Sequence, residues 1–234
     1  MLDALLWGAV AASSLIIGAF AGVIRDWNAR LVGLVLGFGA GALVASISFE
    51  LAEEGVRLGG ALAVAFGLAA GAIVFYVADG AVDRMGSRGA KASGLPLLLG
   101  ALLDGIPEQA VLGIGIADGN GVSLSLLIAI FVSNLPEAIG SASDMKAAHH
   151  RAGRIVLIWT AIAALCPAAT VAGFQLQEVA GAQLRGGING FAAGALLVML
   201  VGSMIPEATE KAAEKAGLAA VLGFAVAAGL SLAT

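Results

Sequence analysis

The chain has 234 residues, of which 60% are hydrophobic and only 12% are charged. Together with a mean hydropathy of +1.00, this composition lies outside the range of soluble globular domains and predicts a polytopic membrane protein. The formal net charge of −4 gives no sign of nucleic-acid binding. A single cysteine, Cys166, excludes an intrachain disulfide and a metal site built from cysteines.

Apolar segments long enough to cross about 30 Å of hydrocarbon, at about 1.5 Å per helical residue, recur along the whole chain. They predict helices, because lipid offers no partner to unpaired backbone groups and the segments lack the alternation of barrel strands. The first segment is too long for the core of a signal peptide, so we expect a retained helix. The eight predicted helices of this single transmembrane domain, residues 1–234, lie near 4–24, 31–52, 59–78, 94–117, 121–145, 154–174, 188–207 and 216–233.

The basic residues predict an orientation for these helices. When both termini are placed outside, every lysine and arginine except Arg57 and Arg185 falls in or beside an inner loop. This bias agrees with the positive-inside rule. We therefore expect an integral protein of a bacterial or archaeal cytoplasmic membrane, with both termini outside.

A short internal repeat links the second and seventh predicted helices. The glycine-rich segment Gly37–Leu43 resembles Gly190–Leu196, and both helices end in acidic residues. Because five helices separate the copies, they cross the membrane in opposite directions. The pattern indicates an inverted repeat of helices 1–3 and 6–8 around helices 4 and 5, as in many transporters. The alternative is that both helices converged on a common glycine-alanine packing pattern.

Carboxylates inside the fourth and fifth predicted helices carry the chemistry. Asp104 and Glu108 lie one turn apart around Pro107, and the Pro136-Glu137 pair follows in the next helix. A proline frees a backbone carbonyl, and an ionisable group at this depth is costly unless it faces an ion, a cavity or a substrate. The alternative is ordinary kinks with protonated or hydrogen-bonded acids. The candidate metal ligands, all offering oxygen, are Asp104, Glu108, Gln109, Ser133, Asn134 and Glu137.

With these motifs the chain resembles the ZIP (Zrt-, Irt-like protein) family of divalent-metal transporters over its full length. The resemblance includes the basic loop after the third helix, the Pro-Glu segments, the glycine-rich second helix and the segment Met204–Glu207 in the seventh helix. It implies a 3+2+3 arrangement of eight helices. It also implies a binuclear site in helices 4 and 5 for zinc, iron, manganese or cadmium as the transported substrate.

The chain departs from the family pattern at several site positions. Asp104 and Ser133 stand where the family usually has histidine, Gly105 replaces an asparagine, and Gln109 replaces a glycine. The sixth helix has no acid between residues 155 and 173. The resemblance then implies that the first metal position survives as Asp104, Glu108 and Glu137, and that the second is weakened or absent. An all-oxygen site suits manganese, magnesium or calcium better than zinc, so we expect less zinc preference.

Three further residues are candidates for the ion pathway. Glu50 at the outer mouth and Glu207 at the inner exit are acids that a plain helix end would also explain. His149 lies at the inner end of the fifth helix, where it would catch a metal leaving the pathway or belong to a solvated basic cluster.

The function expected from these residues is transport of divalent metal cations. The alternative is a protein of the same fold that has lost metal transport and moves protons or another small solute, or acts as a sensor or partner subunit. The missing histidines favour the alternative, whereas the two buried Pro-Glu pairs favour transport. No nucleophile is paired with a base at membrane depth, so we expect no enzyme. Besides lipid, the small-residue helix faces permit a homodimer.

Overall fold

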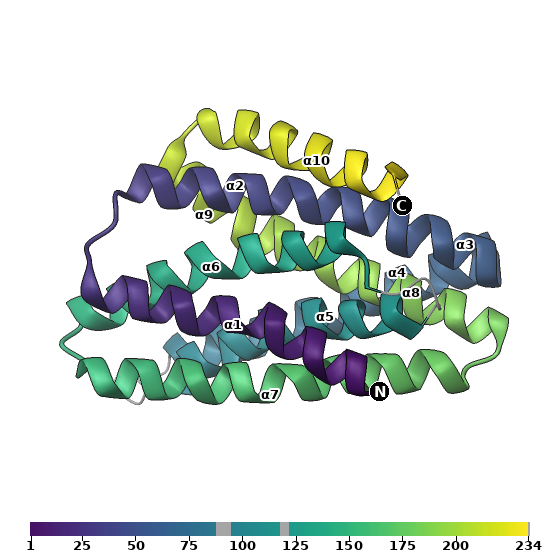
Figure 1. The fold of residues 1–234 in the computed structure, drawn as a ribbon, viewed down its shortest axis with the longest axis horizontal. Helices are drawn as coiled ribbons and strands as arrows, with labels where there is room; N and C mark the ends of the chain where they lie inside the picture. Colours follow the sequence, from purple (N-terminus) through teal and green to yellow (C-terminus); the bar gives the residue numbers. More distant parts are fainter. Residues whose placement is uncertain (88–94, 118–121, 234) are drawn as a thin grey trace.

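The computed structural model describes residues 1–87, 95–117 and 122–233, and leaves out the side chains of residues 83, 85–87, 95–101, 104 and 233. In this part of the chain every regular element is a helix, which confirms the all-α prediction. The helices lie roughly along one long axis and form an elongated bundle (Figure 1). The elements are α1 Leu2–Ile24, α2 Ala29–Ser46, the π-helix η1 Ile47–Glu53, α3 Glu54–Gly59, α4 Ala61–Ser87, α5 Leu95–Ala117, α6 Leu124–Ala147, α7 Ala152–Val179, α8 Ala182–Met199, the π-helix η3 Leu200–Met204, α9 Ile205–Ala212 and α10 Lys215–Ala233.

Among the described residues, seven continuous helical runs are long and apolar enough to cross a membrane. Two of them, Ala29–Gly59 and Ala182–Ala212, are 31 residues long. The expected ranges 31–52 and 188–207 were therefore too short. Each run continues past its apolar part through a π-helical segment, and its polar end is a helix in which a glutamate pairs with a basic residue one turn later.

The glycines of the two repeated segments make matching contacts. A Cβ on Gly41 of α2 would overlap the carbonyl oxygen of Ala220 in α10. A Cβ on Gly194 of α8 would likewise overlap the carbonyl oxygen of Leu68 in α4. Helix backbones approach this closely only where one side has no side chain, which is the usual way that membrane helices associate. The α2–α10 and α8–α4 pairs are thus built by equivalent residues.

A second pair of helix contacts corresponds in the same way. Gly22 of α1 packs on α6, where a Cβ would lie 2.5 Å from the carbonyl oxygen of Ile139. Gly173 of α7 packs on α5, where a Cβ would overlap the carbonyl oxygen of Ala110. Ile139 follows Pro136-Glu137 at the same spacing as Ala110 follows Pro107-Glu108. Each segment that carries a Pro-Glu pair is therefore packed against a helix that offers a glycine, α1 for α6 and α7 for α5.

The described side chains are distributed as expected for a protein in lipid. Large apolar residues face outward, including Leu62 and Phe66 of α4, which are 76% and 75% exposed. The interior, in contrast, contains polar side chains. The buried polar residues are Ser14, Ser46, Glu108, Gln109, Ser125, Ser133, Asn134, Thr170, Gln177 and Asn189. Since an exposed apolar surface of this extent marks an interaction surface, and the runs match a bilayer in length, the protein is an integral membrane protein.

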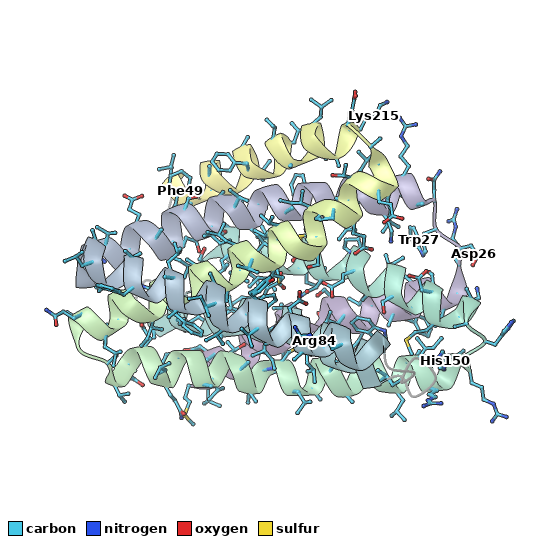
Figure 2. The ribbon with its side chains drawn as sticks, turned by 180° about the vertical axis from the view of Figure 1, so that it is seen from behind. Asp26, Trp27, Phe49, Arg84, His150 and Lys215 are labelled. Carbon is cyan, nitrogen blue, oxygen red and sulfur yellow. The ribbon has the colours of Figure 1, made fainter. Side chains whose placement is uncertain are left out.

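The two ends of the bundle differ in their residues. Both termini lie toward the end that carries α3, and the connection between α1 and α2 lies at the other end (Figure 1). Asp26, Trp27, His150 and Lys215 lie toward this second end, on different sides of the bundle (Figure 2). There the Nζ of Lys146 lies 3.2 Å from Oδ1 of Asp26 and joins α6 to the α1–α2 connection. We refer to it below as the basic end.

Candidate functional site

The two Pro-Glu segments lie within continuous helices. Pro107 is inside α5 and Pro136 is inside α6. A proline at such a position removes one backbone hydrogen bond of its helix and leaves a carbonyl oxygen one turn earlier without its usual donor. Each helix therefore offers a backbone acceptor as well as the glutamate that follows the proline.

Glu108 and Ser133 join the two segments in the protein interior. The hydroxyl Oγ of Ser133 lies 3.1 Å from Oε1 of Glu108 and 3.0 Å from the carbonyl oxygen of Ile130, so it can donate its one hydrogen to either. Both side chains are buried. On the other side of Ser133, α2 approaches so closely that a Cβ on Gly39 would lie 2.8 Å from the Cα of Ser133. The glycine-rich helix α2 is thus packed closely against α6 at Ser133.

Glu137 lines a small cavity on the side of α6 that faces α8 and α9. The cavity holds about 30 Å³, which suffices for a water-sized species. Its walls combine two carboxylates with a hydroxyl, two thioethers and one aliphatic side chain, from Leu36, Glu137, Met199, Ser203, Met204 and Glu207. Glu207 is therefore placed on the same cavity as Glu137.

An ion pair lies at the Glu207 side of this cavity. The Nζ of Lys211 donates a hydrogen bond of 2.7 Å to Oε1 of Glu207, one turn earlier in the helix. The same nitrogen lies 2.9 Å from the point that a Cβ on Gly140 would occupy. Gly140 is one turn after Glu137 in α6, so the ammonium lies directly against the helix that carries Glu137.

The remaining predicted ligands of α5 and α6 are placed as follows. Asn134 is buried, and its Nδ2 has no hydrogen-bond partner among the described residues. Gln109 is buried too, and its Oε1 accepts a hydrogen bond of 2.6 Å from Oγ1 of Thr170 on α7. Asp104 lies in α5, and its side chain is outside the described part of the structure. Within that described part, no three His, Cys, Asp or Glu side chains are grouped as a metal site.

The two other pathway candidates lie toward opposite ends of α6. Glu50, in η1, accepts a hydrogen bond from the hydroxyl of Ser125 near the start of α6. The Oγ of Ser125 lies 2.9 Å from the Oγ of Ser123. His149 is exposed in the turn after α6, with φ of 63°. It follows Glu137 by roughly 18 Å along a helix axis, which places it beyond contact with that carboxylate.

Two neighbours of the site were not singled out by the sequence. Cys166 of α7 lies with its Sγ 3.5 Å from the point that a Cβ on Gly105 would occupy, which is an ordinary van der Waals distance and places the thiol beside α5. Nothing in the sequence pattern connects these two residues. Lys211 is different, because its spacing from Glu207 is that of an ion pair on one helix face and would have indicated the contact.

A comparison with curated proteins finds one relative whose name bears on function. The chain is 27% identical over 206 residues to an Arabidopsis thaliana protein named "Putative zinc transporter". The matched region covers 84% of this chain and 33% of the plant protein, so the chain spans about a third of that relative's length. No protein-family model matches the chain. Most of the chain is therefore similar to one part of a longer plant protein that is named as a transporter.

Proposed function

We propose that the chain is a ZIP-type transporter for divalent metal cations. In this proposal eight membrane helices form a 3+2+3 arrangement, with an inverted repeat around α5 and α6 and both termini outside. The equivalent glycine contacts of α2 with α10 and of α8 with α4 support the repeat. The similarity to a plant protein named as a zinc transporter supports the class of substrate.

The contact between Glu108 and Ser133 carries the proposal. It brings both Pro-Glu segments together inside a bundle whose outer surface is apolar. A charged carboxylate at this depth is costly, and a cation bound beside it offsets that cost. Glu108 and Glu137 with Asp104 would supply the charge, while Ser133 and Asn134 would add neutral oxygens.

The donor atoms favour a cation that binds oxygen well. Within the proposed set, carboxylate, hydroxyl and amide oxygens replace the imidazole nitrogens that zinc prefers. We therefore propose a broad divalent specificity in which manganese competes better against zinc than it does at a histidine site. Gln109 is the weakest ligand candidate, because its oxygen is engaged by Thr170.

Alternating access to this site would follow from the two sets of helices. The helix pair that carries Glu108 and Glu137 and the surrounding repeats would rock against each other, exposing the site to one side at a time. The cavity beside Glu137 and the polar cluster around Glu50 lie in two such directions.

A thermal-shift experiment tests the proposed site. Mn²⁺ or Zn²⁺ should raise the apparent Tm of the purified protein in detergent, because a ligand that binds only the folded state at about 100 times its Kd adds about 2.7 kcal/mol. Glu108→Gln and Glu137→Gln should each abolish most of this shift. Glu178→Gln, an exposed acid on α7, is the matched control and should retain it.

The same experiment distinguishes the alternative function. A protein of this fold that moves protons or another solute would show no metal-dependent shift in the unmodified chain. A shift that persists at full size in both glutamine variants would place the metal elsewhere and overturn the proposed site.

A further inference from the structure

We propose that Lys211 is a tethered cation that competes with the transported ion for Glu207 at the basic end of the pathway. This inference rests on the proposed function, because it assigns a role to the cavity that Glu137 and Glu207 share. The chain's own ammonium group would stand at Glu207 whenever no divalent cation is there.

The position of Lys211 is set by its ion pair on α9 and by packing against two other helices, α6 and α2. Its Nζ lies between Oε1 of Glu207, at 2.7 Å, and the backbone of α6 at Gly140. Its Cβ lies 2.7 Å from the point that a Cβ on Gly33 of α2 would occupy. Two glycines thus leave the space for this one side chain. An ordinary surface lysine has no such enclosure, and here the side chain is only 22% exposed.

The enclosed ammonium of Lys211 affects an ion that passes through the cavity. A divalent cation that leaves Glu137 through the cavity next meets the carboxylate of Glu207, which already holds the ammonium. Two cations at one carboxylate repel each other, and more strongly in a partly buried site than in water. If the ammonium moves aside, the free energy of its ion pair with Glu207 is lost, and if it stays, it repels the ion. The net affinity of the ion falls in both cases, which favours its release toward the basic end.

The opposite end of the protein shows why Lys211 is more than a helix-end ion pair. Glu54 follows Gly37 at the same spacing as Glu207 follows Gly190, and it pairs with Arg57. The Arg57 side chain is 66% exposed, so its charge extends into solvent. The two halves of the chain therefore place a cation at equivalent carboxylates, but only the Lys211 side chain is enclosed.

Equilibrium binding of Mn²⁺ to the full-length protein in detergent, measured by calorimetry, tests the inference. Lys211→Met should tighten the Kd by about fivefold, because it removes a competing charge and keeps an apolar stem. Lys211→Arg keeps the charge and should restore the original Kd. Lys215→Met removes a lysine that lies on the lipid-facing groove of α2 and α10, and this matched control should leave the Kd unchanged.

Two further variants test whether the change in the Mn²⁺ Kd depends on the ion pair between Lys211 and Glu207. Gly140→Ala adds a methyl group 2.9 Å from Nζ, so it should displace the ammonium and tighten the Kd without removing Lys211. In a Glu207→Gln background, Lys211→Met should no longer change the Kd, since the competition takes place at that carboxylate. Thermal unfolding of each variant shows whether it is folded.

Different variants test the role of Lys211 and the metal site in α5 and α6. If Glu108→Gln abolishes Mn²⁺ binding while folded Lys211→Met and Gly140→Ala leave the Kd unchanged, Lys211 does not compete with the ion. If Glu108→Gln leaves Mn²⁺ binding intact, the site in α5 and α6 is itself wrong.

Discussion

Ser133 of α6 is the side chain that links the two helices of the proposed site, because it contacts Glu108 of α5. It stands at a position where the ZIP pattern has histidine, and from sequence it is only a weak oxygen donor. In the structure it is buried with its hydroxyl 3.1 Å from Glu108. A neutral hydroxyl at this point leaves the charge of the site to the carboxylates, which is the basis for the proposed tolerance of manganese.

The identity of the donor atom at this position should set the metal preference. Ser133→Cys replaces the hydroxyl by a thiol of similar size, and soft sulfur ligands favour zinc over manganese. We expect the ratio of the Mn²⁺ Kd to the Zn²⁺ Kd to rise by about tenfold. Ser133→Ala, which removes the oxygen without adding sulfur, is the control and should weaken both ions alike. An unchanged ratio in Ser133→Cys would show that this side chain does not face the ion.

The sequence predicted which charged residues are buried better than it predicted which residues contact them in space. Burial of Glu108 follows from its place in an apolar helix, because the prediction needs only local sequence. The enclosure of Lys211 could not be foreseen, because it depends on Gly33 and Gly140, which are remote from it along the chain. A lysine one turn from a glutamate at a helix end is ordinarily a solvated pair.

At the scale of elements, the structure depends on glycines that let helices approach. Gly41 and Gly194 each face a carbonyl oxygen of a neighbouring helix, and rigid backbone cannot move aside as a side chain would. Their equivalence means that one type of substitution tests both halves of the chain.

Alanine at either glycine should destabilise the protein. Gly41→Ala and Gly194→Ala each insert a methyl group into a closed helix contact, and overpacking of this kind costs about 1–3 kcal/mol. We expect a lower Tm in detergent for both variants. Gly229→Ala in α10 is the control, because a Cβ there meets no atom within 4 Å. Equal Tm values for all three variants would contradict the close α2–α10 and α8–α4 contacts.

The lengths of the helices could be predicted only in part. Hydropathy identifies the apolar segment that lies in lipid, and it gave the expected ranges 31–52 and 188–207. It carries no signal for helix that continues into the polar ends, where Glu54 with Arg57 and Glu207 with Lys211 form pairs along the helix. Those extensions matter, because one of them carries Lys211, which pairs with Glu207 beside the cavity of Glu137.

At the scale of the whole molecule, the distribution of basic residues bears on the proposed orientation in the membrane. Asp26, His150 and Lys215 all lie toward the end that carries the α1–α2 connection (Figure 2). The other end carries α3 with few basic residues, and under the positive-inside rule we propose that the basic end faces the cytoplasm.

This orientation can be checked by labelling of single cysteines. In a Cys166→Ala background, Asp26→Cys should react with a membrane-impermeant maleimide only in inverted vesicles, because its loop lies at the basic end. Gln183→Cys, exposed at the start of α8, should react in intact cells. Labelling of residue 26 in intact cells would reverse the proposed topology.

Sequence alone determined the all-helical membrane class, because lipid permits few structures and the required apolar segments are visible in composition. It also located Glu108 and Glu137, since a charge within such a segment stands out against its neighbours. Only the tertiary structure decided which groups lie together: Ser133 with Glu108, Glu137 and Glu207 on one cavity, and Lys211 against α6 at Gly140. These contacts join residues of different helices, and in lipid their alignment depends on small-residue packing that no single segment specifies.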